Sequence, residues 1–213
     1  LCLENTSRGK AVSLKKIAAS YELAKKSDLS VHLDGARFFN AITDLGCSPM
    51  DHANFSDTIS ICLSKGLGAP AGSLLVLPKD LARKARRIRK LAGGSLRQSG
   101  VLAAAGIYAL DNNIERLKED HDRAKYFKNE LLKFFGNMPE KRVSADTNMV
   151  FFTDISEKFK EIIPFFKKEN ILLSKWSSNT LRIVFHLDVN DIAMKKLMGA
   201  FKKFYEPTFA SLS

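Results

Sequence analysis

Short apolar runs and longer amphipathic segments alternate along the first half of the chain. A short apolar run bounded by turn residues is typical of a buried strand, and apolar residues spaced three or four apart indicate a helix. The expected strands lie at residues 1–3, around Val31 and around Ile59, and the expected helices over residues 13–27 and 38–45. Ser13 is expected to be the N-cap of the first helix. Alternation of strands with helices predicts a mainly parallel sheet, so the fold class is α/β.

A further strand is expected at residues 73–77. The four residues 68–71 that separate it from the Ile59 strand are too few for a helical crossover, so this pair is predicted to be antiparallel. From residue 79 to about residue 135 the pattern is helical, with interruptions at Gly93-Gly94 and at Asn112-Asn113. This long helical stretch is expected to connect two domains.

A second pattern of strands and helices begins at Asn148. The expected strands are 149–152, 171–173 and 181–185, and the expected helices are 157–169 and 190–205. These elements describe a small α+β domain. We therefore expect a partial, mainly parallel large domain over residues 1–117 and a small C-terminal domain over residues 118–213.

Composition favours a folded globular protein, because 45% of the residues are hydrophobic and only six are proline. The formal charge of +11 raises the possibility of nucleic-acid binding. The densest basic cluster, residues 83–90, would spread its cations around a helix, and no aromatic residues alternate with them to stack on bases. We expect a solvated or subunit-facing helix here and no nucleic-acid partner.

Three scattered cysteines show neither metal-ligand spacing nor a disulfide pattern, which favours a reducing, cytoplasmic location and no metal site. The longest apolar run, residues 101–110, is too short to span a bilayer and is expected to be a buried helix. No membrane contact is expected. Because Leu1 already lies inside an apolar run, the chain is expected to be a fragment.

Charged residues follow two of the predicted strands. Lys65 comes after the Ile59 strand and before glycines, and Asp34 ends the Val31 strand with Arg37 one turn further on. Open α/β sheets bind ligands at the carboxyl ends of their strands. An amine, a carboxylate and a guanidinium at neighbouring strand ends fit pyridoxal 5'-phosphate, which needs a Schiff-base lysine, a partner for its pyridinium nitrogen and a cation for the substrate carboxylate.

Each of these residues also has an ordinary structural interpretation. Lys65 is alternatively an exposed loop lysine, although burial after an apolar strand would favour the neutral amine that attacks an aldehyde. Asp34 is alternatively an N-cap, and Arg37 a helix-surface residue. The three together favour the cofactor site.

Several long motifs, in the same order along the chain, resemble the low-specificity L-threonine aldolases. This family belongs to the pyridoxal-phosphate enzymes of the aspartate aminotransferase fold. The motifs are Leu3-Glu4-Asn5-Thr6, His32-Leu33-Asp34-Gly35-Ala36-Arg37, Leu63-Ser64-Lys65-Gly66-Leu67-Gly68, Gly93-Gly94-Ser95-Leu96-Arg97-Gln98 and Leu181-Arg182-Ile183-Val184-Phe185-His186. Because they span nearly the whole chain, the resemblance is specific.

The resemblance implies cleavage of L-threonine or L-allo-threonine to glycine and an aldehyde, as part of threonine breakdown and glycine formation, by a homo-oligomer (a dimer or a tetramer). It implies that Lys65 forms the Schiff base and that Asp34 pairs with the pyridinium nitrogen. Arg37 would contact cofactor and substrate, Arg97 the cofactor phosphate, and Arg182 the substrate carboxylate. His186 also matches the family pattern, but a structural role is expected for it.

Two departures from the family keep other interpretations open. Family members have an N-terminal portion ahead of the first motif, and they usually carry a histidine where this chain has Ser7. A related enzyme that eliminates at the β-carbon is therefore one alternative. A truncated, non-catalytic remnant that retains the subunit surfaces is the other.

Overall fold

The computed structural model describes residues 1–136 and 141–210 of the 213-residue chain. These form two compact units, Leu1–Lys118 and Glu119–Ser213. The division lies beside the predicted domain boundary. Within the described residues, no helix combines the length and the apolar character needed to cross a membrane.

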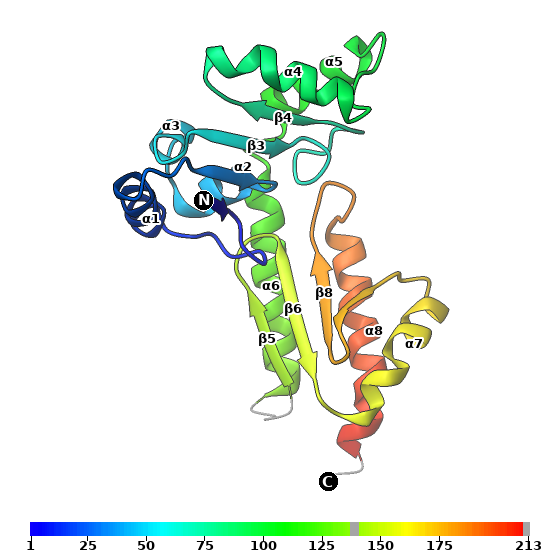
Figure 1. Cartoon of the computed structure of the whole chain (residues 1–213). Helices are drawn as coiled ribbons and strands as arrows, with labels where there is room; N and C mark the ends of the chain where they lie inside the picture. The colour runs from blue at the N-terminus through cyan, green and yellow to red at the C-terminus, as the bar shows by residue number, and fades with distance from the viewer. Residues whose placement is uncertain (137–140, 211–213) are drawn as a thin grey trace. The chain divides into compact units, whose positions relative to one another are not determined.

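The first unit is built on a four-stranded sheet in the order β1-β2-β3-β4 (Figure 1). The strands are β1 (Cys2–Glu4), β2 (His32–Gly35), β3 (Thr58–Cys62) and β4 (Ser73–Val76). β1, β2 and β3 are mutually parallel, and β4 pairs antiparallel with β3. Both the parallel sheet and the antiparallel pair were predicted from the sequence and are confirmed.

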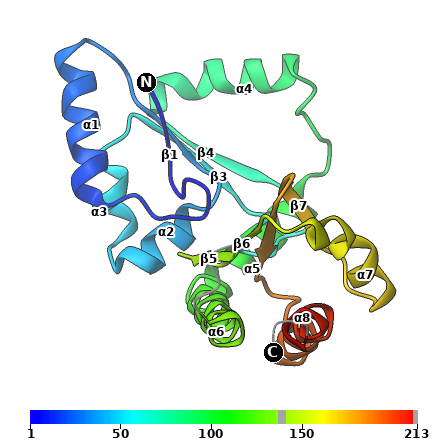
Figure 2. The same cartoon turned by 90° about the horizontal axis from the view of Figure 1, so that it is seen from below.

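Three helices gather on one side of this sheet (Figure 2): α1 (Leu14–Lys26), α2 (Phe38–Leu45) and the short α3 (Pro49–Ala53), which the sequence patterns did not predict. A buried cluster joins Leu33, Ile59 and Ile61 of the strands to Phe38 and Ile42 of α2. Ser13 is the N-cap of α1 as predicted, but its side chain makes no capping hydrogen bond. The apolar faces of strands and helices therefore pack as their periodicity predicted. Ser13 has the backbone position of an N-cap but does not stabilise the helix through its side chain.

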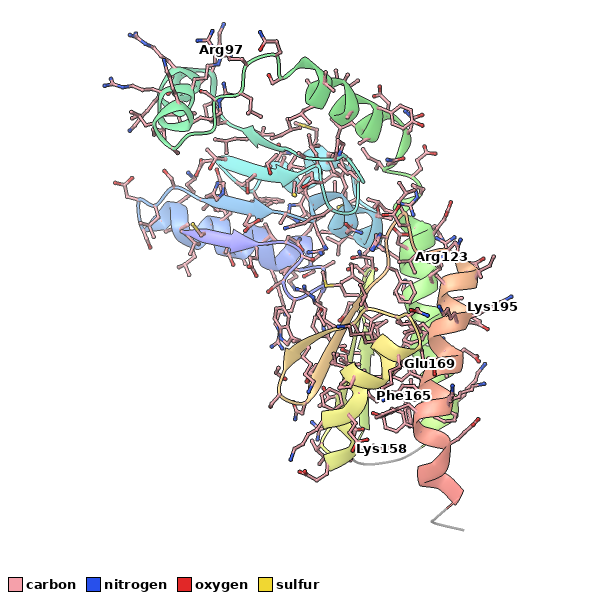
Figure 3. The ribbon with its side chains drawn as sticks, turned by 90° about the vertical axis from the view of Figure 1, so that its right-hand side faces the viewer. Arg97, Arg123, Lys158, Phe165, Glu169 and Lys195 are labelled. Atoms are coloured by element: carbon pink, nitrogen blue, oxygen red, sulfur yellow. The ribbon has the colours of Figure 1, made fainter. Side chains whose placement is uncertain are left out.

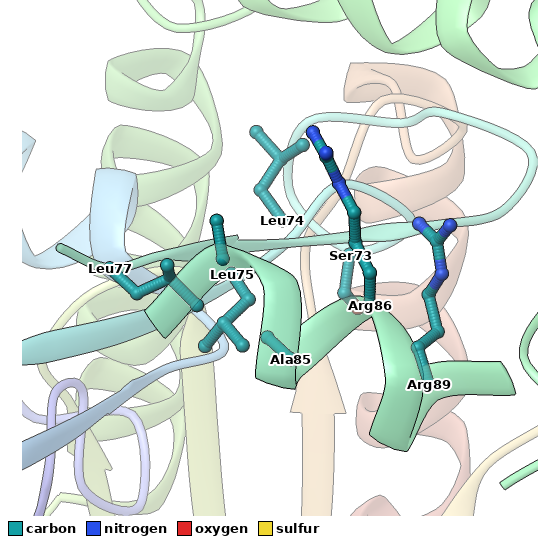
Figure 4. Close-up of a pocket in the computed structure, with 8 residues that line it drawn as sticks. Ser73, Leu74, Leu75, Leu77, Ala85, Arg86 and Arg89 are labelled. Atoms are coloured by element: carbon teal, nitrogen blue, oxygen red, sulfur yellow. The ribbon is translucent and has the colours of Figure 1, made fainter. Parts of the chain in front are cut away.

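The chain then passes through a short 3-10 turn (Lys79–Leu81) into α4 (Ala82–Leu91), which lies beside the edge strand β4, and continues into α5 (Gly100–Asn112). A groove of about 440 Å³ between β4 and α4 is lined by leucines of the strand and by Ala85, Arg86 and Arg89 of the helix (Figure 4). No residue of α4 is buried.

The expectation that residues 101–110 form a buried helix is wrong in its burial. The helix is present as α5, but only Gly106 and Ala109 in it are buried, and Val101 is 80% exposed. An apolar sequence indicates a helix that packs against another element. It does not show that the same chain, folded alone, supplies the cover.

The second unit packs helices on an antiparallel sheet in the order β5-β6-β8-β7. Its strands are β5 (Lys141–Ala145), β6 (Met149–Asp154), β7 (Ser174–Ser177) and β8 (Thr180–Val184), and its helices are α6 (Leu117–Phe135, which begins in the first unit), α7 (Ile162–Lys168) and α8 (Asp191–Ala210). α6 and α8 lie side by side against the same face of this sheet (Figure 2). Phenylalanines dominate the core between them, among them Phe127, Phe152 and Phe201, which are fully buried.

Three predictions in this unit need correction. The strand expected at residues 171–173 lies instead at β7, because pairing with β8 selects residues 174–177, while Ile171 and Leu173 reach the core from an irregular segment. The helix expected over 157–169 is divided into a 3-10 segment, Glu157–Glu161, and α7. β5 was not predicted, because its sequence shows little alternation.

Candidate active site

The turn that carries Lys65 follows the carboxyl end of β3. The backbone N–H of Gly68 donates to the Lys65 carbonyl at 3.0 Å, and the N–H of Ala69 donates to the Leu63 carbonyl at 3.0 Å. Asn113 of the region after α5 donates its side-chain Nδ2 to the carbonyl of Leu67 at 2.7 Å. Hydrogen bonds from both sides therefore hold this turn in one conformation.

Gly66 makes the turn possible, because it lies tightly against α2. A Cβ atom at Gly66 would be 2.7 Å from Oδ1 of the buried Asn40 and 3.1 Å from a methyl group of Leu117. Real Cβ atoms do not approach backbone or amide atoms so closely without displacement. The glycine after Lys65 is thus required by packing.

The Lys65 side chain is exposed in this chain, so the expectation of burial is not met. Burial would require a covering element, and none of the described segments supplies one. Within the described residues its ammonium group makes no hydrogen bond or ion pair. The amine is therefore accessible for chemistry.

The pKa of Cys62, the last residue of β3, is affected by the nearby Lys65 ammonium. Burial opposes ionisation of the thiol, but the hydrogen bond with Ser64 (Sγ to Oγ, 3.4 Å) and the charge of Lys65 outweigh it, so the pKa of Cys62 is lowered. The Lys65 ammonium therefore has a direct electrostatic effect at the end of the strand.

Asp34 lies at the carboxyl end of the neighbouring strand. In the parallel pairing of β2 with β3, Asp34 is opposite Ser60, and in the pairing with β1 it is opposite Glu4. Its carboxylate oxygen Oδ1 accepts a hydrogen bond from the backbone N–H of Ala36 at 2.9 Å, and its side chain is otherwise exposed. The structure thus brings Asp34 and Lys65 to one edge of one sheet, as the parallel topology predicted.

Arg37 and Arg97 belong to the same unit but to different surroundings. Arg37 is half-buried and is the N-cap residue of α2, directly after β2. Arg97 is exposed in the turn between α4 and α5 (Figure 3). Arg37 is close to Asp34 along the chain, whereas Arg97 stays apart from the sheet edge in the connection that leads into α5.

Arg182 is part of the second unit, on β8. Its guanidinium carbon lies 5.0 Å from the centre of the Trp176 ring, an attractive cation–π arrangement. Its Nε is buried and has no hydrogen-bond partner among the described residues. Arg182 lines a pocket of about 450 Å³ together with Ser174, His186 and Lys196, so a cation borders a space of ligand size.

Two residues that the motifs singled out make local contacts. The Ser7 hydroxyl donates to Oε2 of Glu4 at 3.1 Å. The His186 ring nitrogen Nδ1 accepts from the backbone N–H of Asp188 at 3.3 Å and lies 3.6 Å from that residue's carboxylate. The second set of contacts agrees with the structural role expected for His186.

Sequence reasoning missed the polar groups that support this edge. Asn40 packs against Gly66 of the Lys65 turn, and Asn113 donates a hydrogen bond to that turn. His52 of α3 contacts Asn5, which directly follows β1. Asn5 could have been singled out, because it belongs to the first motif. Nothing in the local pattern around His52 indicates that it is buried.

An amine, a carboxylate and a guanidinium at one sheet edge match the groups that pyridoxal 5'-phosphate requires. The Lys65 amine without a competing partner suits a covalent bond to an aldehyde carbon, and the Asp34 carboxylate suits a protonated ring nitrogen. The chemistry of the residues present therefore fits this cofactor.

Known proteins resemble this chain over most of its length. The profile of the beta-eliminating lyase family matches residues 1–155. The "Low specificity L-threonine aldolase" of Escherichia coli K12 is 40% identical over 204 residues, which cover 96% of this chain and 60% of that protein. The "Probable low-specificity L-threonine aldolase 2" of Arabidopsis thaliana is 36% identical over 212 residues, with 96% and 59% covered. The chain thus spans about 60% of the length of these relatives.

Solved structures with low sequence identity share the fold. A threonine aldolase from Leishmania major superposes with a TM-score of 0.75 at 16% identity, over 95% of this chain and 60% of that one. An ornithine aminotransferase from Plasmodium yoelii superposes with a TM-score of 0.67 at 14% identity, over 96% and 56%. The predicted α/β fold of the aminotransferase type is confirmed.

Proposed function

This chain belongs to the beta-eliminating lyase family, and from that premise we propose that the protein cleaves L-threonine or L-allo-threonine to glycine and an aldehyde. The observation that carries the proposal is the placement of Lys65 and Asp34 at the carboxyl ends of adjacent parallel strands. The similarity to threonine aldolases over nearly the whole chain supports the same reaction class.

We propose pyridoxal 5'-phosphate as the cofactor. Lys65 would hold it covalently, Asp34 would keep its ring nitrogen protonated, and Arg37 and Arg97 would bind it through charge-assisted hydrogen bonds, Arg97 at the phosphate. When bound, the cofactor supplies a conjugated ring that accepts the electron pair of a broken carbon–carbon bond.

Arg182 would bind the substrate carboxylate, a role that the family resemblance implies for Arg37 as well. The Trp176 ring, 5.0 Å from the Arg182 guanidinium carbon, supports this side chain at the wall of the pocket that it lines. A fixed carboxylate in turn fixes which bond of the α-carbon faces the ring, which is a positioning effect. Arg182→Lys should therefore raise KM about tenfold or more, because a lysine cannot present two parallel donors.

Cofactor binding is the direct test of the site. The purified chain is mixed with pyridoxal phosphate, reduced with borohydride and digested, and the labelled lysines are mapped by mass spectrometry. We expect stoichiometric labelling of Lys65 and only background labelling of an exposed lysine such as Lys79. Lys65→Arg should abolish the specific label. Equal labelling of all exposed lysines would contradict the proposed site.

Product analysis separates the aldolase from the related elimination reaction. Glycine and an aldehyde from L-threonine support cleavage of the carbon–carbon bond, whereas ammonia and a keto acid identify β-elimination. Elimination is retained as the second candidate because Ser7, engaged by Glu4, stands where relatives of the resembled family usually have a histidine. Neither product set from a cofactor-labelled protein would support the non-catalytic alternative.

We propose that the active form is a homo-oligomer. The exposed apolar side chains of α5, among them Val101, Ile107 and Tyr108, support a further covering surface. Light scattering should give a mass above that of one chain. A monomer across the accessible concentration range would contradict this proposal.

We also propose a cytoplasmic location. The three cysteines Cys2, Cys47 and Cys62 are all free, which agrees with a reducing compartment. Fractionation of the native host cells, with the protein followed by antibody, tests this location.

A further inference from the structure

The Asn5 side chain links three segments of the first unit. Its Oδ1 accepts from the backbone N–H of Val12 at 2.9 Å, and its Nδ2 donates to the Val12 carbonyl at 3.1 Å. The same Nδ2 lies 2.6 Å from Nε2 of His52, on α3. Its backbone N–H donates to the carbonyl of Asp34 at 3.0 Å. Asn5 thus connects the turn 5–12 and α3 to the residue proposed to face the cofactor ring.

These contacts determine the protonation state of His52. The exchange of two hydrogen bonds with Val12 fixes which end of the Asn5 amide is Nδ2, so the group that faces His52 is a donor. Nε2 must therefore be an acceptor, and the single proton of the neutral ring must lie on Nδ1. Nδ1 itself is buried and has no hydrogen-bond partner outside its own residue among the described residues.

We propose that His52 is a positioning residue: its neutral imidazole holds Asn5, and through Asn5 the end of β1 against Asp34, so that this edge of the site stays intact only while His52 is uncharged. The proposal rests on the proposed function for the role of Asp34. The contacts that carry it do not depend on any cofactor.

A second proton on His52 would break this arrangement. It would have to bind Nε2, the atom that accepts from Asn5, and two donors would then face each other at 2.6 Å. The Asn5 amide cannot turn over to offer its oxygen without losing both bonds to Val12. Acid should therefore release Asn5 and the turn it holds.

Apart from Asn5, the described contacts of the His52 ring are apolar, and none of the described residues forms an ion pair with it. The His52 side chain is fully buried, and its ring packs edge-to-face against Phe38 of α2 at 5.5 Å between centroids. Burial is the leading cause that lowers the pKa of His52 below its ordinary 6.5, with only its own backbone opposing it.

Charged groups on the elements around α3 do not change this conclusion. Asp51, next to His52 on α3, accepts from Ser48 instead. The charged residues of the neighbouring helices are Lys15, Lys16, Glu22, Lys25 and Lys26 on α1 and Asp44 on α2. Lys25 is paired with Asp57. None of these, among the described residues, is a cause of the His52 shift in pKa.

Amide hydrogen exchange of the cofactor-free chain tests directly whether His52 holds Asn5. The reporter is the Val12 N–H, which donates to Asn5, and the Ile61 N–H in the centre of the sheet corrects for global unfolding. In the wild type, we expect the protection of Val12 to fall about tenfold between pH 7.5 and pH 5, because protonation of His52 opposes the bond that holds Asn5. His52→Gln offers an acceptor that cannot be protonated, so its protection should change less than about twofold.

His52→Leu removes the acceptor, so Val12 should be poorly protected at both pH values. If His52→Leu does not fold, the wild type and His52→Gln alone decide. The same loss of protection in His52→Gln as in the wild type would overturn the proposal. So would titration of the His52 ring near its ordinary pKa with no change at Val12.

Cofactor affinity, followed by absorbance, tests the consequence for the site. We expect His52→Leu to weaken pyridoxal phosphate binding about tenfold and His52→Gln to preserve it. Unchanged affinity in a His52→Leu protein that has lost Val12 protection would overturn the link to Asp34. If the wild type itself binds no cofactor, the proposed function fails, while the exchange result still decides whether His52 holds Asn5.

Discussion

At the scale of single residues, the second unit contains a buried pair whose strength is easily measured. The Tyr205 hydroxyl donates to Oδ2 of Asp154 at 2.6 Å, and both side chains are buried. The other carboxylate oxygen, Oδ1, accepts from the backbone N–H of Ser156. Burial, and then the bond to Asp154, raise the pKa of Tyr205 far above its ordinary value, so the hydroxyl stays protonated and continues to donate.

Tyr205→Phe removes that donor and leaves a buried carboxylate oxygen without it. We expect the free energy of unfolding to fall by about 1–3 kcal/mol. Tyr126→Phe is the matched control, because Tyr126 is 52% exposed and should change stability by less than about 0.5 kcal/mol. Urea denaturation measures both. Equal effects of the two substitutions would show that the Asp154 bond contributes nothing.

His52 predicts a specific dependence of stability on pH. Because its pKa is lowered in the folded chain, the unfolded chain binds a proton below pH 6.5 that the folded chain does not. Stability therefore falls as the pH drops below 6.5, by up to about 1 kcal/mol near pH 5.5. His52→Gln should lose this part of the decline between about pH 7.5 and 5.5 in urea denaturation. A decline as steep as that of the wild type would assign it to other groups.

At the scale of elements, the Lys65 turn depends on the absence of a side chain at Gly66. Gly66→Ala would force the turn away from Asn40 and Leu117, so we expect a loss of about 1–3 kcal/mol in stability and weaker labelling of Lys65 by pyridoxal phosphate. Gly199→Ala in α8 is the control, because no atom lies within 4 Å of its added Cβ. That substitution should be neutral or stabilising, by about 0.5–1 kcal/mol. A neutral Gly66→Ala would mean that the turn can shift freely.

The N-termini of α1 and α3 offer a matched comparison of two serine caps. Ser48 accepts from the backbone N–H of Asp51 at 3.1 Å, and the Asp51 carboxylate accepts from the Ser48 N–H at 3.0 Å. The Ser48 side chain, and then its backbone N–H, lower the pKa of Asp51. Ser13 has the same position at α1 without any side-chain bond. Ser48→Ala should therefore cost about 1 kcal/mol, and Ser13→Ala only a few tenths, in thermal or urea unfolding. The reverse order would contradict this account.

At the scale of the whole molecule, the exposed apolar side chains of α5 predict assembly. Ile107 is 61% exposed on α5, so Ile107→Glu would place a charge inside an apolar contact between chains. We expect this variant to remain folded but to have a lower mass in light scattering than the wild type. Leu172→Glu, at a position that is 86% exposed in the second unit, is the control and should leave the mass unchanged. An unchanged mass for both would place any oligomer contact elsewhere.

Much of the first unit could be predicted because its signals are local. The apolar runs of β2 and β3, the glycines after Lys65 and the short loop before β4 each constrain only a few neighbouring residues, and together they imply a parallel sheet with an antiparallel edge. Since parallel strands end at one edge, Lys65 and Asp34 could be placed together from the sequence. The exposure of these two side chains could not be predicted, because it depends on which other elements pack against them.

Other features depended on contacts between distant segments. The 171–173 strand was misplaced because an apolar triplet satisfies the core equally well from an irregular segment, and only pairing with β8 selects residues 174–177. The burial expected for α5 and for Lys65 was likewise decided by which elements cover them. Neither pattern nor composition carries that information.

The sequence alone determined the α/β class and the mainly parallel sheet with its antiparallel pair, and it predicted which residues converge at the carboxyl ends of the strands, since each follows from short-range periodicity and from the geometry of parallel strands. Only the tertiary structure decided that His52 is buried and contacts Asn5, 47 positions away. A hydrogen bond between such distant residues, and the burial that lowers a pKa, arise from packing of the whole unit, for which no local pattern is a signal.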